Sequence, residues 1–207
     1  MELNADYDRE VRIMREAYIQ RKTKETEIAV RLNLDGTGEA QVKTGIGFFD
    51  HMLTAFARFA YLDLILEASG DLEVDAHHTI EDCGIVIGQA LREACGDKVG
   101  IERLGEALLP MDEALVQVAL DLSNRPYLIW DMDCPDGRVG EFPVEMAEEF
   151  FRALAVQSGL TLHVRKLSGK NRHHLLEAAF KGVGRALGLA LRLNTRYSGI
   201  LSTKGVL

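Results

Sequence analysis

The sequence predicts an α+β fold built by internal duplication. Two observations support this. Segments with the period-two alternation of half-buried strands are followed by segments with helical apolar spacing, and this order occurs twice along the 207 residues. In addition, His77 and His173 each begin the pattern His-His-x-x-Glu, 96 positions apart. Strands followed by helices in two successive repeats are typical of an α+β fold.

The first repeat contains three expected strands and two expected helices. Residues 26–34 alternate between apolar and polar side chains, which predicts a strand. Asp35 and Gly36 then indicate a tight turn into a return strand near residues 40–42. Apolar spacing predicts helices over 48–59 and 80–95, with a strand at 62–66 between them. In the second helix, Gly84 and Gly88 would allow close packing.

The second repeat shows the same order. Strands are expected at residues 115–120, 127–130 and 160–165, and helices over 144–156 and 174–193. At the 96-residue offset Gly88 aligns with Gly184, and an offset of 98 places Glu149 opposite His51. No Pro/Ser-rich linker separates the halves. We therefore expect one unit of two fused repeats, about residues 20–100 and 108–193, followed by a C-terminal tail.

Composition limits the possible functions. Apolar residues make up 47% of the chain, which is enough for a core, and the net charge of −8 argues against a general nucleic-acid binder. The first residues are acidic and lack the apolar segment of a signal peptide, so none is expected, and no apolar run reaches membrane-spanning length. The three cysteines, Cys83, Cys95 and Cys134, have no paired spacing, which predicts reduced thiols and a cytoplasmic location.

The two His-His-x-x-Glu motifs are candidate metal ligands. Positions i and i+4 share one face of a helix. The pair His77 and Glu81 could therefore hold one ion, and His173 with Glu177 another. Nitrogen and carboxylate ligands without a thiolate suit Mn, Fe, Zn or Ni. The alternative is that these histidines are ordinary surface or core residues at helix starts.

The second histidine of each motif points in another direction. His78 and His174 are rotated by about 100° from their neighbours on a helix. The simplest arrangement has two ions, each bound by the His/Glu pair of one motif and by the second histidine of the other. The matched helix of each repeat would supply a fourth ligand, which is His51 for one ion and Glu149 for the other.

Other polar residues bear on two alternatives to an enzyme. One alternative is a structural metal clasp at a subunit contact, and the other is a phosphate-binding module without chemistry. A structural clasp does not require a carboxylate such as Glu25 at a strand start together with hydroxyl and ammonium groups near the end of the chain. The terminal Ser202, Thr203 and Lys204 are of the kind that can hold a phosphate, and Arg103, Arg125 and Lys181 are further candidate cations.

Four ordered motifs resemble those of the imidazoleglycerol-phosphate dehydratase family. They are residues 44–53 (TGIGFFDHML), 75–82 (DAHHTIED), 169–177 (GKNRHHLLE) and 202–207 (STKGVL). The resemblance runs from about residue 21 to residue 207. It implies a four-stranded sheet with two helices on one face in each half. It also implies a homo-oligomeric shell of 24 subunits, in which subunits share the active sites.

The same resemblance implies a dimanganese centre. One ion would be bound by His51, His78, His173 and Glu177, and the other by His77, Glu81, Glu149 and His174. The implied hydro-lyase reaction removes water from D-erythro-imidazole-glycerol phosphate to give imidazole acetol phosphate in histidine biosynthesis. Two ions bound to the ring nitrogens would draw charge from the neighbouring carbon, and Glu25 would take its proton as general base. The implied substrate contacts are Glu25, Arg103, Arg125, Lys181, Ser202, Thr203 and Lys204.

Two positions depart from the family pattern. Many relatives have histidine where this chain has Glu149, and a carboxylate there should change the metal affinity without abolishing binding. Relatives also often have histidine where this chain has Phe59, a position close to substrate in the family.

Overall fold

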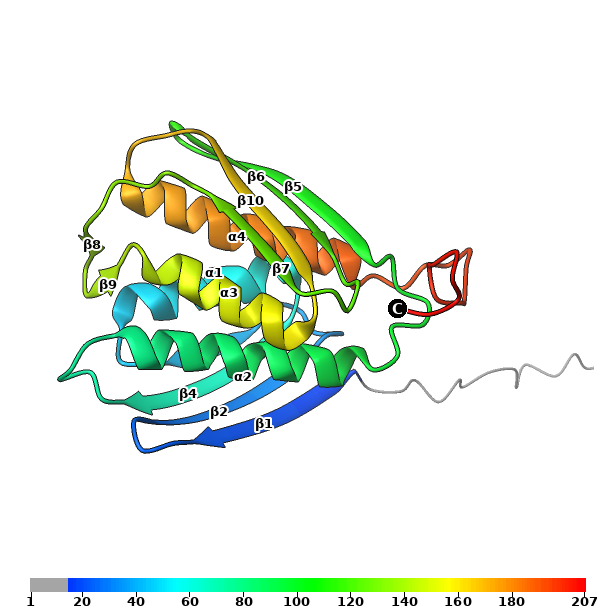
Figure 1. The fold of residues 1–207 in the computed structure, drawn as a ribbon, viewed down its shortest axis with the longest axis horizontal. Helices are drawn as coiled ribbons and strands as arrows, with labels where there is room; N and C mark the ends of the chain where they lie inside the picture. Colours follow the sequence, from blue (N-terminus) through cyan, green and yellow to red (C-terminus); the bar gives the residue numbers. More distant parts are fainter. Residues whose placement is uncertain (1–14) are drawn as a thin grey trace, which may run out of the picture.

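Four helices lie between two four-stranded sheets in the computed structural model, which describes residues 15–207 (Figure 1). The inner face of each sheet is apolar; Ile28, Val30 and Leu32 on one strand are at most 1% exposed. Because alternate residues of a strand face opposite sides, the polar residues between them face outward. None of the helices in the described part combines the length and apolar character needed to cross a membrane.

The first half forms one sheet and two helices. In chain order its elements are β1 (Glu16–Lys22), β2 (Thr26–Asn33), β3 (Ala40–Lys43), α1 (Gly47–Ala60), β4 (Asp63–Gly70) and α2 (His77–Cys95). The strand order is β1-β2-β4-β3, with β3 and β4 parallel and the other pairs antiparallel.

The second half repeats this topology. Its elements are β5 (Leu104–Met111), β6 (Ala114–Asp121), β7 (Tyr127–Asp131), α3 (Met146–Ser158), β10 (Thr161–Ser168) and α4 (Arg172–Ala190), with a small β8 (Arg138–Val139) and β9 (Phe142–Pro143) hairpin inserted. The strand order is β5-β6-β10-β7, again with one parallel pair. The predicted α+β duplication is therefore confirmed.

The predicted return strand after Asp35 exists, but its expected hairpin pairing was wrong. β3 pairs in parallel with β4, which lies between β2 and β3. The Asp63 carboxylate accepts hydrogen bonds from the backbone N–H groups of Thr37 at 2.8 Å and Glu39 at 3.0 Å. These bonds fix the loop between β2 and β3, which passes over the place that β4 takes in the sheet. The turn therefore belongs to a crossover connection and not to a hairpin.

The first strand of each half, β1 and β5, had no clear signal in the sequence. β1 lies at the sheet edge, and Ala17 is its only buried residue. On β5 the large apolar residues Leu104 and Leu108 face outward and are 59% and 61% exposed. Edge strands that bury so few side chains lack the alternation on which a strand prediction depends.

Glycines let the helices of the two halves pack closely against each other. α2 packs against α3, and α1 packs against α4. A Cβ atom on Gly88 would lie 2.8 Å from the carbonyl oxygen of Leu154, and one on Gly184 would lie 2.4 Å from that of Phe56. The two contacts are equivalent under the duplication, so the same close approach is used twice. The expectation of close packing at Gly88 is confirmed.

Candidate metal centre and substrate pocket

Both His-His-x-x-Glu motifs lie in the first turn of a helix, but only α4 has a side-chain cap, which Asn171 supplies. The Asp75 side chain accepts a hydrogen bond from the backbone N–H of His77 at 2.7 Å, and Asn171 accepts one from that of His173 at 2.9 Å. Asp and Asn side chains commonly satisfy the free N–H groups at a helix start. Each glutamate follows the first histidine of its motif by four residues on a helix and therefore lies on the same face.

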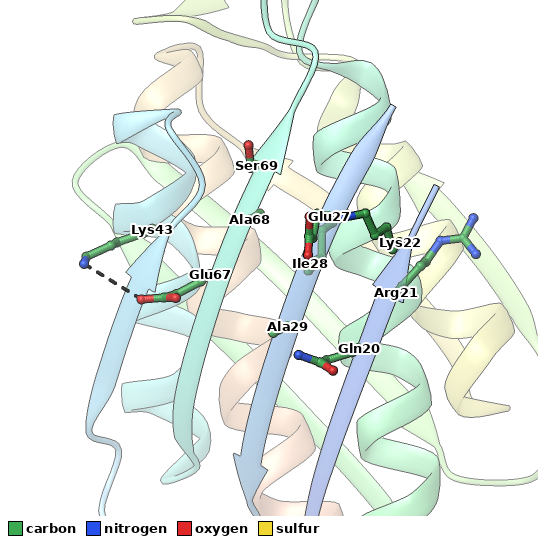
Figure 2. Close-up of a pocket in the computed structure, with 10 residues that line it drawn as sticks. All are labelled: Gln20, Arg21, Lys22, Glu27, Ile28, Ala29, Lys43, Glu67, Ala68 and Ser69. Atoms are coloured by element: carbon green, nitrogen blue, oxygen red, sulfur yellow. Dashed lines mark hydrogen bonds and ion pairs between the residues drawn. The ribbon is translucent and has the colours of Figure 1, made fainter. Parts of the chain in front are cut away.

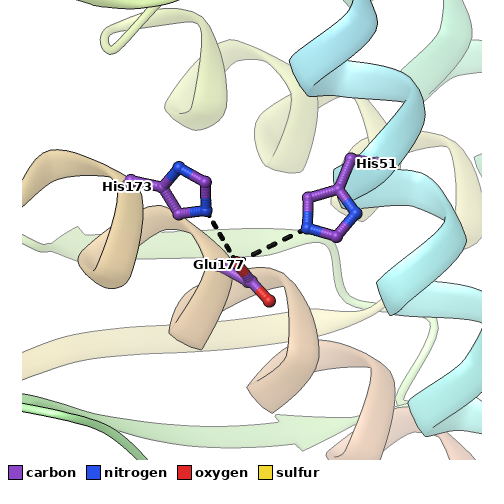
Figure 3. Close-up of side chains that lie close together, drawn as sticks. All are labelled: His51, His173 and Glu177. Atoms are coloured by element: carbon purple, nitrogen blue, oxygen red, sulfur yellow. Dashed lines mark hydrogen bonds and ion pairs between the residues drawn. The ribbon is translucent and has the colours of Figure 1, made fainter.

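Three candidate ligands meet where α1 crosses the start of α4 (Figure 3). His173 Nε2 lies 2.9 Å and His51 Nε2 lies 3.5 Å from Oε2 of Glu177. Their ligand atoms all fall within 4.8 Å of one another. We call His51, His173 and Glu177 the histidine cluster. Two imidazoles and a carboxylate at this spacing are a suitable donor set for a divalent transition metal.

The Glu177 carboxylate lies among a lysine and two histidines that favour its charged form. Burial raises its pKa, but hydrogen bonds from Lys181 and His173 and the charges of Lys181 and His51 outweigh burial and lower the pKa overall. Lys181 Nζ lies 2.6 Å from Oε1 of Glu177 and 5.3 Å from the ring centre of Phe59. Phe59 therefore contacts a residue of the predicted substrate site and forms a cation–π pair with it.

An aromatic wall supports the His173 ring. Phe48 on α1 meets His173 edge-on, with ring centres 5.1 Å apart, and Phe142 on β9 packs against Phe48 at 5.5 Å. Phe142 comes from the β8–β9 hairpin, which has no counterpart in the first half. The two halves therefore differ beside their otherwise equivalent motifs.

The first motif is more open than the second. His77 Nε2 lies 3.5 Å from Glu81 Oε2, and both side chains are nearly half exposed. Glu149 contacts Arg152 instead, at 3.8 Å. Within residues 15–207 the histidine cluster is the one group of three or more candidate ligands that comes together. The structure does not bring Glu149 into such a group with His77 and Glu81.

A carboxylate orients the second histidine of each motif away from the cluster. His78 Nδ1 donates to Asp71 at 3.0 Å, and His174 Nδ1 donates to Glu113 at 2.7 Å. These hydrogen bonds raise the pKa of both histidines, and the bond from His174 lowers the pKa of Glu113 to about 2. Such a carboxylate places the proton on Nδ1 and leaves Nε2 as the ligand atom. Sequence spacing did not identify Asp71 or Glu113.

Glu25 lies in the turn between β1 and β2, close to the first motif. Thr23 Oγ1 accepts a hydrogen bond from the Glu25 N–H at 3.0 Å, and the Glu25 carbonyl accepts one from the Asp71 N–H at 3.1 Å. The structure therefore places the turn of the exposed Glu25 next to Asp71, the residue that also bonds to His78.

A second site lies at the far end of the chain. Its cavity of about 810 Å³, which we call the tail pocket, is lined by Arg103, Arg125, Tyr197, Leu201, Ser202, Thr203, Lys204, Val206 and Leu207. Arg103 Nε donates to Asp121 at 2.7 Å, and Arg125 lies 3.5 Å from the same carboxylate. Five of the residues predicted to contact substrate thus meet in one cationic pocket suited to a phosphate.

The histidine cluster and the tail pocket are far apart. His173 lies in the first turn of α4, whereas the Arg103 N–H bonds to the carbonyl of Ala190, the last residue of that helix. A helix of 19 residues is about 28 Å long. Figure 1 shows the chain end at the opposite end of α4 from β8. One small ligand cannot occupy both places in a single chain.

A hollow on the outer face of the first sheet lacks comparable chemistry (Figure 2). Its charged side chains are already paired, Lys43 with Glu67 at 3.9 Å and Lys22 with Glu27 at 2.5 Å. The side chains that could hold a metal lie elsewhere, so this hollow is not the candidate site.

Comparisons with known proteins agree with these features. The family model described as imidazoleglycerol-phosphate dehydratase matches residues 44–187. The protein of that name from Desulfitobacterium hafniense is 75% identical over 94% of this chain and 99% of its own length, and the one from Moorella thermoacetica is 58% identical over 93% and 98%.

Solved structures of the same enzyme share the fold. The crystal structure from Staphylococcus aureus has a TM-score of 0.79 and 41% identity, covering 86% of this chain and 99% of that one. The structure from Pyrococcus furiosus has a TM-score of 0.78 and 42% identity, covering 91% and 100%. Both are similar to this chain over nearly their whole length.

Proposed function

Because the chain belongs to the imidazoleglycerol-phosphate dehydratase family, it is a lyase of histidine biosynthesis, and we propose that each active site is completed by more than one copy of it. The reaction removes water from imidazole glycerol phosphate to give imidazole acetol phosphate. The separation of the histidine cluster from the tail pocket along α4 carries this proposal. Because the chain belongs to an enzyme family, we reject the hypotheses of a metal clasp and of a binding module without chemistry.

We propose two Mn²⁺ ions per site as the cofactors. The histidine cluster would hold one ion with His78 of another copy, and His77, Glu81 and Glu149 would hold the second with His174 of another copy. His78 and His174 each bond to a carboxylate and do not belong to the histidine cluster of their own chain, which supports this exchange. When bound, divalent ions supply Lewis-acid stabilisation of negative charge on the imidazole ring.

Glu25 is the proposed general base. Its side chain is exposed, so substrate can reach it, and its backbone is fixed from both sides by Thr23 and Asp71. A carboxylate held near the reacting C–H group can take its proton, and the same group can return a proton after water leaves. Lys181, held between Glu177 and Phe59, is the proposed contact to the glycerol phosphate on the metal side.

The tail pocket is the proposed phosphate site. Arg103 and Arg125 share the single carboxylate of Asp121, which leaves positive charge for an anion, and Ser202, Thr203 and Lys204 add hydroxyl and ammonium donors. A tail pocket that faces the histidine cluster of another copy would let both hold one substrate. We propose a homo-oligomer on this basis, with the 24 subunits that the family resemblance implies.

We also propose a cytoplasmic location. The three cysteines of the chain, Cys83, Cys95 and Cys134, are free thiols, as expected for a protein in a reducing compartment.

A turnover assay tests the proposed function. The purified protein with Mn²⁺ should convert imidazole glycerol phosphate, and Glu25→Gln should bind substrate while kcat falls by about 10²- to 10⁴-fold. Glu27→Gln is the matched control, because Glu27 lies two residues away, is exposed and pairs with Lys22. Full activity of Glu25→Gln would eliminate Glu25 as the base. Sizing the protein with and without EDTA then tests sharing, since the proposed ligand exchange predicts a smaller species after chelation.

A further inference from the structure

Lys98 is an unusual residue for the loop that joins the two halves. It is 2% exposed, and it is the one lysine or arginine among the buried residues of the described chain. Its backbone has a φ of +62°, in the left-handed region that side chains other than glycine rarely adopt. An aliphatic side chain of similar size would avoid the desolvation of a buried ammonium group. The folding of the loop alone therefore does not explain a lysine here.

The ammonium group of Lys98 has a specific partner across the halves. Lys98 Nζ donates to Oδ1 of Asn124 at 2.5 Å. Within residues 15–207 no carboxylate forms an ion pair with Lys98, and burial lowers its pKa. After burial, the groups that affect the pKa of this lysine are Cys95 and Arg92 on α2, and then Asp121 and Arg103 beside the tail pocket.

Asn124 belongs to the turn that carries Arg125. The turn follows β6, and Asn124 is itself in the left-handed region with a φ of +57°. It packs against Gly159 at the end of α3, where a Cβ atom would lie 3.2 Å from the Asn124 Cα. Asn124 is thus held from one side by Gly159 and from the other by Lys98.

The remaining contacts of the turn fix the Arg125 backbone. Its N–H donates to Ser123 Oγ at 3.1 Å, and its carbonyl accepts from Thr161 Oγ1 at 2.8 Å. The Arg125 guanidinium then reaches the tail pocket with only a 3.5 Å contact to Asp121 and a 3.4 Å bond to the Ser123 carbonyl. Its side chain is 68% exposed, so its position depends on the turn beneath it.

We propose that Lys98 is a positioning residue for phosphate recognition, which holds Asn124 and thereby the turn that presents Arg125 to the tail pocket. The inference rests on the proposed phosphate role of that pocket. It extends the site to a residue that does not line the pocket and that lies in the loop after α2.

Steady-state kinetics with inorganic phosphate as a competitive probe tests this role. Lys98→Met removes the ammonium group and keeps the aliphatic stem. Asn124→Gly removes the acceptor and still permits a positive φ. We expect each variant to raise both KM for substrate and the inhibition constant of phosphate by about tenfold, with kcat within about twofold. The double variant should be no worse than either single one, since both remove the same hydrogen bond.

Two controls keep the outcomes distinct. Lys43→Met removes an exposed lysine on the outer face of the first sheet and should change neither constant. Arg125→Gln should raise the phosphate constant, which tests the tail pocket directly. If Arg125→Gln raises the inhibition constant of phosphate while Lys98→Met and Asn124→Gly leave it unchanged, the Lys98 proposal is overturned. The proposal that the tail pocket binds phosphate then still holds. If phosphate inhibits the wild type and Arg125→Gln equally, both proposals fall.

Discussion

Nδ1 of His78 donates a hydrogen bond to the carboxylate of Asp71 at 3.0 Å. The N–H of Asp71 also holds the Glu25 carbonyl at 3.1 Å. One residue therefore orients a proposed metal ligand and the turn of the proposed base. In the second half, His174 bonds to Glu113 at 2.7 Å, and Glu113 lies in the β5–β6 turn, which corresponds to the β1–β2 turn that carries Glu25.

Asp71→Asn should weaken the binding of Mn²⁺. The amide can present an N–H to the ring and no longer favours the Nδ1 proton, so the dissociation constant should rise by about 10- to 100-fold. Glu113→Gln should have a similar effect through His174. Titration of metal-free protein with Mn²⁺, followed by calorimetry, measures both. Unchanged affinity in both variants would show that these carboxylates do not orient ligands.

Phe59→Leu should affect substrate binding through Lys181. The substitution removes the ring that lies 5.3 Å from Lys181 Nζ and keeps an apolar side chain. Loss of a cation–π pair of about 0.5–1 kcal/mol should raise KM by about two- to fivefold with little change in kcat. Comparison of KM and kcat in the variant and the wild type measures this. A fall in kcat alone would contradict it.

Gly184→Ala should destabilise the protein. The added Cβ would lie 2.4 Å from the Phe56 carbonyl oxygen, and a backbone atom in a packed helix cannot move aside readily. A loss of about 1–3 kcal/mol in the free energy of unfolding is expected. Urea unfolding measures it, with Gly47→Ala as the control, since nothing lies within 4 Å of a Cβ there. Equal midpoints for the two variants would show that the helices can separate freely.

Cys83 and Cys95 should not react with thiol reagents in the native protein near pH 7.5. Both are buried, and burial raises the pKa of Cys83 above its usual range and that of Cys95 to about 11, so little thiolate forms. We expect at most one thiol per chain to react, from the half-buried Cys134, and three after unfolding. Cys134→Ser should abolish the native reaction. A second fast thiol in that variant would contradict the described burial.

Regular spacing made part of the molecule predictable. The i, i+4 relation between His173 and Glu177 follows from helical geometry. The repeat offset indicated His51 as a further ligand, and the family resemblance grouped it with these two residues. The carboxylates of Asp71 and Glu113 were not predictable, because loops without periodicity determine which acid meets each histidine. Burial of Lys98 was equally hidden, since a lysine beside Asp97 and Gly96 suggests an exposed turn.

The distance along α4 was also beyond prediction. The family resemblance implied that subunits share the site that contains His173 and Ser202, and the fold shows that a whole helix separates the two residues in one chain. In genetic terms, the arrangement predicts complementation between defective copies. A chain with Glu177→Gln and an intact tail pocket could join a chain with Arg125→Gln and an intact histidine cluster. Some sites in such a mixed oligomer would combine the intact histidine cluster of one chain with the intact tail pocket of the other. Two inactive variants that are unfolded and refolded together would therefore recover part of the activity.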